Sequence, residues 1–235
     1  MSQDVSGFWK TVDNAAKSTG TVETVKLAAK MVGRWPGGAP LTLAPDRDDP
    51  DFARATRFFY HEKDRVGRGC PVGAHVRRTN PRDALEPQPG TADSVSVNKR
   101  HQLLRRGRTY GAPVVETMDP ADILASDADE GNRGLHFICL CANIARQFEF
   151  VQGSWVNNPQ FDGLVDDVDP LIGRRGRFTD EANVDPRATF TMPEGDTRRR
   201  VHDLPDFVTI RGGAYFFLPG IRALKFIANC PVEER

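Results

Sequence analysis

The feature that most constrains the fold is a short, glycine-led apolar run over residues 134–142, which reads GLHFICLCA. A run of this length and composition predicts a strand that is fully buried. Residues 143–152 follow without a turn and carry Ile144, Phe148 and Val151 at helical spacing. A buried strand that leads directly into an amphipathic helix favours a layered fold, in which helices cover a sheet.

Three more segments are typical of helices. Apolar side chains recur at helical spacing over residues 3–16 and again over residues 23–35, where Pro36 and two glycines end the pattern. A closing helix is expected over residues 220–228, just after Pro219, because proline is well suited to the first helical turn. Helices therefore stand at both ends of the chain.

Two strands are expected over residues 207–210 and 214–218, on either side of a glycine bend. Residues 79–97 and 157–206 hold few large apolar side chains, and we expect both to be loop-rich excursions at the surface. Strands interleaved with helices, together with an antiparallel pair, favour the α+β class.

Charge and cysteine content narrow the class of protein. The chain has 32 basic and 32 acidic side chains, so it lacks the basic excess of a dedicated nucleic-acid or membrane-surface binder. The arginine clusters are expected to be solvated faces. The four cysteines do not have the spacing of a zinc site, and no apolar stretch is long enough to span a membrane. We expect a cytoplasmic protein with reduced thiols, no nucleic-acid partner and no membrane.

The sequence offers little conventional catalytic chemistry. It contains no G-x-G-x-x-G, P-loop, G-x-S-x-G or H-E-x-x-H motif, and its five histidines are dispersed. His75 stands among three arginines in residues 70–83, CPVGAHVRRTNPRD. One histidine is enough to bind haem, because the porphyrin supplies four nitrogens and the protein needs to add only an axial ligand. From the residues alone, a structural role for His75 is the commoner alternative.

Four successive blocks resemble the dye-decolourising (DyP-type) peroxidase family. They are CPVGAHVRRTNPRD, HQLLRRGRTYG, GLHFICLCANIARQFEFVQGSW and VTIRGGAYFFLPGIRAL, and with MVGRWPGGAPL and DDPDFARATRFFYHE they cover nearly the whole chain. The resemblance implies a ferredoxin-like antiparallel sheet with helices on one face, of the dimeric α/β-barrel type. It also implies one haem b per chain, bound against the sheet.

The resemblance gives roles to individual residues. His75, in the family's G-A-H-x-R motif, is implied to be the proximal ligand of the haem iron, with its second ring nitrogen donating to an acceptor that orients the ring. Arg105 is implied to be catalytic on the distal side, where a guanidinium orients peroxide and stabilises the charge that develops as the O–O bond breaks. Leu135 and Phe137 match apolar residues over the distal haem face.

The arginines beside His75 are expected to bind the haem propionates. The candidates are Arg77, Arg78 and Arg82, and the alternative is that some of them pair with Asp83 or Glu86. As cations, they are also expected to disfavour protonation of His75. Six tryptophan and tyrosine side chains are candidates for electron relay, for which core packing is the alternative. They are Trp9, Trp35, Tyr60, Tyr110, Trp155 and Tyr215.

The sequence departs from the family at one motif. The family's distal acid–base residue is the aspartate of G-x-x-D-G, and this chain has no such motif: Asp162 precedes Gly163, but no glycine stands three residues before Asp162. We interpret residues 1–235 as the C-terminal haem-ligating domain, one half of the family's two-half fold.

The predicted function is a haem-dependent peroxidase that reduces hydrogen peroxide and oxidises dyes or phenolic and aromatic donors, impaired here without the distal aspartate. One alternative is a haem-binding protein without catalysis. The other is an interaction module that packs against a homologous partner or an encapsulating shell, and a homo-oligomer is a further expected partner. The sequence leaves open the physiological reducing substrate and whether the chain is a natural truncation or has a mis-set start.

Overall fold

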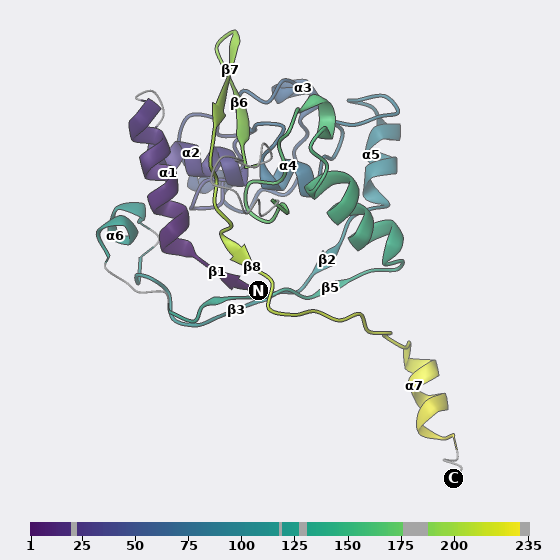
Figure 1. The fold of residues 1–235 in the computed structure, drawn as a ribbon. Helices are drawn as coiled ribbons and strands as arrows, with labels where there is room; N and C mark the ends of the chain where they lie inside the picture. Colours follow the sequence, from purple (N-terminus) through teal and green to yellow (C-terminus); the bar gives the residue numbers. More distant parts are fainter. Residues whose placement is uncertain (20–22, 118, 127–130, 176–187, 231–235) are drawn as a thin grey trace.

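A computed structural model describes residues 1–19, 23–117, 119–126, 131–175 and 188–230 (Figure 1). The strands are β1 (Ser2–Gln3), β2 (Leu104–Arg105), β3 (Arg108–Tyr110), β4 (Gly134–His136), β5 (Cys139–Leu140), β6 (Phe190–Glu194), β7 (Thr197–Val201) and β8 (Val208–Thr209). The α-helices are α1 (Val5–Thr19), α2 (Thr24–Val32), α3 (His61–Asp64), α4 (His75–Thr79), α5 (Ala92–Lys99), α6 (Pro120–Ala125) and α7 (Ile221–Ala228). Single turns of other helix types are η1 (Pro50–Phe52), η2 (Ala145–Glu149), η3 (Val151–Val156) and η4 (Phe161–Gly163).

The central sheet has the strand order β3-β4-β1-β8, and all of its neighbours are antiparallel. Along the chain β1 is followed by α1, then by the β3 and β4 pair, then by the η2 and η3 helical segment, and last by β8. The first strand therefore lies between the third and the fourth, as in a ferredoxin-like split β-α-β arrangement. The predicted α+β, ferredoxin-like fold is confirmed, and Figure 1 shows the body of helices and loops on one side of this sheet.

Strands β2 and β3 form one continuous ribbon with β5 and β4. Leu104 pairs with Leu140 at one end and Tyr110 with Gly134 at the other, and every pair between them keeps the same register. The amide of Arg106 donates to the carbonyl of Ile138 at 2.7 Å, which bridges the gap between the two short pairs of strands. Residues 104–110 and 134–140 are thus a single antiparallel unit without a bulge.

The prediction of a fully buried strand over residues 134–142 is wrong. Gly134 is buried, but Phe137, Ile138 and Leu140 are 37%, 49% and 41% exposed. Phe137 lies on the face that is turned toward the helical layer, but that layer does not bury it, and no described element covers the opposite face, which carries Ile138 and Leu140. An apolar composition on both faces therefore does not mean that this chain buries both.

The prediction of surface excursions over residues 157–206 is also wrong for much of the described part. Phe161, Leu164, Val168, Phe190 and Met192 are all buried, and β6 and β7 form an antiparallel hairpin. The hairpin packs in the same core as α1 and α2, so this segment contributes core as well as loops. Residues 176–187 lie outside the described residues. The other predicted loop region, residues 79–97, includes most of α5.

The predicted helices over residues 3–16 and 23–35 are confirmed as α1 and α2, each a few residues shifted or shorter. Gly33 ends α2 in the left-handed conformation, with φ of 96°, and its amide donates to Ala29. No helix in the described part of the chain is long and apolar enough to span a membrane.

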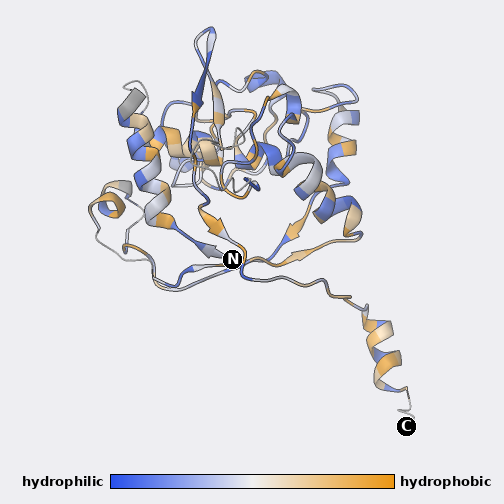
Figure 2. Cartoon of the chain, viewed as in Figure 1, coloured by the Kyte–Doolittle hydropathy of each residue, from blue (hydrophilic) through white to orange (hydrophobic). Residues whose placement is uncertain are grey.

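The C-terminal end differs from the expectation of a second strand over residues 214–218. After β8 the chain runs extended without sheet pairing, and the closing helix α7 forms as predicted but projects away from the body (Figure 1). We call residues 210–228 the C-terminal arm; Figure 2 shows its apolar character in orange. Its nine large apolar side chains are each between 50% and 86% exposed: Ile210, Tyr215, Phe216, Phe217, Leu218, Ile221, Leu224, Phe226 and Ile227.

Candidate functional site around His75

His75 is the first residue of α4, directly after the loop that contains Gly73 and Ala74. Its Nδ1 lies 2.9 Å from Oδ2 of Asp169, whose side chain is fully buried, while the His75 side chain is 21% exposed. With the proton on Nδ1, the imidazole donates to Asp169 and presents the Nε2 lone pair on its exposed side. Among the described residues, Nε2 has no hydrogen-bond partner, so this nitrogen is available to a ligand.

Asp169 is held rigidly by the main chain around it. Its Oδ1 accepts hydrogen bonds from the amides of Leu171 and Ile172 at 2.9 and 3.0 Å, and its own amide donates to Val156. Burial by itself would raise the pKa of Asp169, but the charge and hydrogen bond of His75 and the two amides hold this pKa below its ordinary value. A buried, ionised carboxylate therefore fixes the orientation of the imidazole.

The same pair overturns the expected effect of the arginines on His75. Burial lowers the pKa of His75 and so does the charge of Arg105, but the Asp169 carboxylate more than offsets both, and the pKa of His75 is raised. The sequence showed the cations next to His75 but not the aspartate 94 positions later that outweighs them. An acceptor for the second ring nitrogen of His75 was expected, but no pattern in the sequence identifies Asp169 as that acceptor.

Arg78 is a structural residue in this fold. Its side chain is fully buried, and its guanidinium donates to the carbonyls of Trp155, Asn158 and Asp167 at 2.7, 3.1 and 2.6 Å. These contacts join α4 to η3 and to the loop that carries Asp169. The predicted role in binding a propionate does not agree with this geometry, because three main-chain oxygens already surround the charge.

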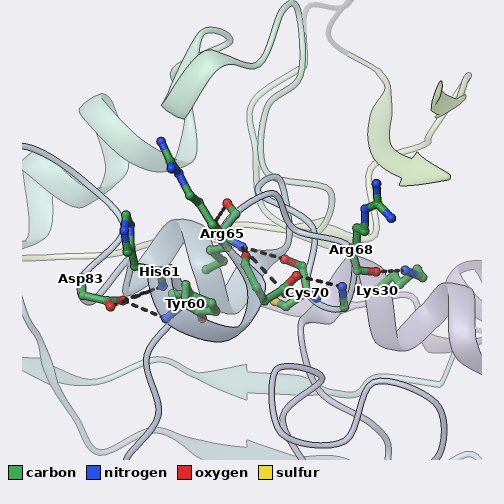
Figure 3. A network of polar contacts seen from close by, with 10 residues as sticks. Lys30, Tyr60, His61, Arg65, Arg68, Cys70 and Asp83 are labelled. Atoms are coloured by element: carbon green, nitrogen blue, oxygen red, sulfur yellow. Dashed lines mark hydrogen bonds and ion pairs between the residues drawn. The ribbon is translucent and has the colours of Figure 1, made fainter. Parts of the chain in front are cut away.

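Arg77 is enclosed in the same way on the other side of α4. It is 1% exposed, donates to the carbonyls of Asp64, Arg65 and Cys70, and stacks over the ring of Tyr60 at 4.6 Å. Figure 3 labels three of these neighbours, Tyr60, Arg65 and Cys70. The predicted propionate contact is therefore also at odds with the position of Arg77.

Arg82 and Asp83 do not form the ion pair that was the alternative to propionate binding. The guanidinium of Arg82 lies 3.8 Å from the centre of the Phe58 ring and donates to the carbonyl of Thr56. Asp83 is buried and accepts from the amides of Tyr60 and His61, as the dashed lines in Figure 3 show. In this network the guanidinium groups donate mostly to main-chain carbonyl oxygens and seldom to carboxylates.

The predicted distal residues lie together on the ribbon. Arg105 pairs with Cys139, so it shares a face with Phe137 and Leu135, because side chains alternate along a strand. This face is turned toward the helical layer: the rings of Phe137 and Phe148 are 6.1 Å apart, and the charge of Arg105 is felt at His75. The structure thus brings His75, Arg105, Leu135 and Phe137 to facing surfaces.

The fit of a haem group can be judged from these contacts. One imidazole nitrogen is anchored and the other is free, and the opposite surface offers apolar side chains and one cation, which is the donor set that an axially ligated porphyrin requires. A surface cavity of about 560 Å³ lies elsewhere, between α3 and α5, and none of the predicted site residues lines it. His75, Asp169, Arg105, Leu135 and Phe137 fit the group, whereas Arg77 and Arg78 do not.

Known proteins share the sequence and the fold of this chain over most of its length. No protein-family model matches the chain. Peroxidase 2 of Mycetinis scorodonius is 34% identical over 91% of this chain and 42% of its own length, and the multifunctional dye peroxidase DyP2 of an Amycolatopsis species is 34% identical over 85% of this chain and 41% of its own. The solved structure of DyP2 from Amycolatopsis superposes with a TM-score of 0.70 at 30% identity, over 89% of this chain and 44% of that structure.

The chain therefore spans less than half the length of the curated relatives that it matches. Within that span, the agreement in sequence covers most of the chain and the agreement in fold includes the ferredoxin-like sheet. Over the part of these relatives that it spans, the chain belongs in sequence and in fold to the dye-decolourising peroxidase family.

Proposed function

We propose that this chain is the haem-binding portion of a DyP-type peroxidase, which reduces hydrogen peroxide and oxidises dyes or other aromatic donors. The observation that carries the proposal is the His75–Asp169 pair, because it leaves one imidazole nitrogen anchored and the other free. Membership of a peroxidase family supports the reaction class, and His75 lies in the block that resembles the family's ligand motif.

In this proposal His75 is the axial ligand through Nε2, and Leu135 and Phe137 lie over the opposite face of the porphyrin. Haem, when bound, would supply the redox-active iron at which peroxide is cleaved. Asp169 holds the imidazole in one tautomer and increases its basicity, since a second-shell carboxylate strengthens a histidine ligand. Arg105 orients peroxide and stabilises the negative charge that develops on its oxygens.

Proton transfer is the weak step in the proposed mechanism. The sequence contains no G-x-x-D-G motif, so this chain does not carry the aspartate that moves the proton in the family's pattern. Arg105 stabilises charge but remains protonated throughout, so it is a poor acid–base catalyst. We propose that turnover by this chain alone is slow, and that haem binding is the more robust of its two properties.

The test begins with haem binding. Titration of haem into the purified chain is expected to give a Soret band with the spectrum of a histidine-ligated iron, and His75→Ala is expected to abolish it. His202→Ala is the matched control, because His202 is exposed and takes no part in the contacts described for His75 and Asp169. A Soret band that survives in His75→Ala would rule out the proposed ligand.

Catalysis is tested separately with the haem-loaded chain. Peroxide-dependent bleaching of an anthraquinone dye is expected at a low rate, and Arg105→Leu should reduce that rate by about 100-fold without changing the Soret band, as for the loss of one charge-stabilising donor. If the dye is bleached equally well by Arg105→Leu, the catalytic role is wrong. If haem binds but no dye is bleached by the wild-type chain, the non-catalytic haem-binding alternative is preferred.

A further inference from the structure

Two cysteine thiols meet at the end of β5. The sulfur atoms of Cys139 and Cys141 are 3.9 Å apart, and neither forms a disulfide. Cys139 pairs directly with Arg105 across the ribbon, where Figure 1 shows β5 beside β2, so both thiols lie on the face that carries Arg105. Both residues are partly exposed, so a molecule as small as hydrogen peroxide can reach them.

The spacing of the two cysteines permits a disulfide after a small change in the backbone. Two residues along a strand rise about 6.4–6.8 Å, which is at the upper end of the roughly 4.4–6.8 Å between the Cα atoms of a disulfide. Strand β5 ends at Leu140, so Cys141 lies outside the ladder and can move without breaking a strand pair. A bridge at this limit is strained, and strained disulfides are the easily reduced ones.

The environment of the two thiols favours oxidation and sets its order. A structural zinc site needs four ligands, and the described part of the chain holds no group of three histidine, cysteine, aspartate or glutamate side chains that could bind a metal ion. Burial, together with the charge and hydrogen bond of Cys141, raises the pKa of the Cys139 thiol to about 11. Cys139 therefore stays protonated at neutral pH. Because the thiolate is the nucleophile, we expect Cys141 to react first.

We propose that Cys139 and Cys141 are a peroxide-sensitive dithiol site, which hydrogen peroxide oxidises to a reversible disulfide. The Cys141 thiolate first attacks one oxygen of the peroxide. An S–O bond forms, the O–O bond breaks, and the leaving hydroxide takes up the proton that Cys141 released, which gives water and a sulfenic acid. The Cys139 sulfur then attacks the sulfenic sulfur, so that the S–S bond forms, the S–O bond breaks, and hydroxide leaves with the Cys139 proton as a second water.

The two steps balance without any other reactant. The pair of thiols loses two electrons and two protons, and one hydrogen peroxide becomes two waters. Neither step needs haem, so the inference stands apart from the proposed peroxidase chemistry, although hydrogen peroxide is the oxidant in both.

Tryptic peptide mapping of the purified chain, without added haem, tests the proposal. Trypsin releases residues 134–146 as one peptide with both thiols, because arginines stand at positions 133 and 146 and no lysine or arginine lies between them. After treatment with excess peroxide, this peptide is expected to lose about 2 Da, the mass of two hydrogen atoms, and glutathione should restore it. Cys230→Ser is the matched control: Cys230 is exposed, and this variant should form the same bridge.

Two serine variants test the order of the steps. In Cys139→Ser the sulfenic acid on Cys141 has no thiol to resolve it, so dimedone, which traps sulfenic acids, should label this peptide at least ~10-fold more than in the wild-type chain or in Cys141→Ser. Stronger labelling of Cys141→Ser than of Cys139→Ser would overturn the assigned order.

The measurement on the wild-type chain decides the site itself and needs no variant. A peptide of residues 134–146 that keeps both thiols in excess peroxide would overturn the proposal. So would a peptide whose sulfurs are joined to a different peptide, or one that gains oxygen as sulfinic acid and forms no bridge. A bridge that resists excess glutathione would overturn its reversibility. A failed haem titration would change none of these outcomes, so the two proposals can fail separately.

Discussion

The surroundings of His75 and the C-terminal arm differ in how far the chain itself buries and pairs their side chains and backbone groups. Around His75 the charges of Asp169 and Arg78 are fully buried, and each has partners supplied by the chain itself. In the arm, large apolar side chains and a row of backbone groups face solvent. The difference teaches that the chain itself supplies the polar partners of the residues around His75, whereas it supplies no cover for its C-terminal surface.

The sharpest way to break this comparison is to label one cysteine in each region. Burial raises the pKa of Cys70 in the body to about 12, whereas Cys230, which lies two residues beyond the arm, is exposed. A thiol with this pKa is almost entirely protonated at neutral pH and is enclosed as well, so we expect iodoacetamide to alkylate Cys230 at least ~1000-fold faster than Cys70. Peptide mass spectrometry after timed labelling measures the two rates.

Labelling in denaturant provides the control for that experiment, since both thiols should then react at similar rates. Comparable rates in the native chain would show that the body opens as readily as the arm, and the contrast between the two regions would be lost.

The next largest effect is expected from Asp169→Ala. This change leaves His75 and the amides of Leu171 and Ile172 without their acceptor in a buried site, and we expect a loss of about 4 kcal/mol in the free energy of unfolding. Urea denaturation of the haem-free chain measures it. Asp196→Ala is the control: the Asp196 side chain is fully exposed in its ion pair with Arg68, so it should change stability by less than about 0.5 kcal/mol.

Arg78→Met should cost somewhat less, about 3 kcal/mol, because it removes three charge-assisted hydrogen bonds but fills most of the volume. Arg78→Lys is expected to recover little of this loss, since an ammonium group cannot reach three carbonyls arranged around a planar fork. The measurement is made without haem, and that choice decides the role. If Arg78→Met destabilises only the haem-loaded chain, Arg78 binds the cofactor and the structural role given to it is wrong.

The smallest effect is expected within the arm. Ile227→Ser replaces a side chain that is 58% exposed, so it should change the free energy of unfolding of the body by less than about 0.5 kcal/mol. Thermal unfolding of the chain checks this expectation. A loss of more than 1 kcal/mol would mean that the arm contributes to the stability of the single chain, contrary to its few contacts.

Much of the architecture could be predicted from local patterns. The helical spacing of apolar side chains located α1 and α2 to within a few residues. Burial could not be predicted in the same way. The run over residues 134–142 is apolar enough for a core strand, yet no described element covers its outer face. The hydrophobicity of a residue shows that it can be buried, but it does not show whether another element packs against it.

The hydrogen-bond partners of the charged residues could not be predicted from the sequence either. Nothing in the local sequence of Arg77 and Arg78 shows that carbonyl oxygens will surround them, because those carbonyls come from loops up to 89 positions away. The same holds for Asp169, which is one of several aspartates in a polar segment until the fold brings it to His75. Long-range electrostatic pairing is a property of the topology and is not encoded in spacing.

The unbroken ribbon of residues 104–110 and 134–140 has a consequence for how this sequence can change. Because side chains alternate between the two faces, an insertion or deletion of one residue inside either strand would turn Arg105 to the opposite face from Leu135 and Phe137. Only insertions or deletions of an even number of residues in the strands keep Arg105 on the same face as Leu135 and Phe137. The connection between Tyr110 and Gly134 is not restricted in this way. In evolutionary terms, we expect insertions and deletions of one residue in these two strands to be selected against, because they would move Arg105 to the other face.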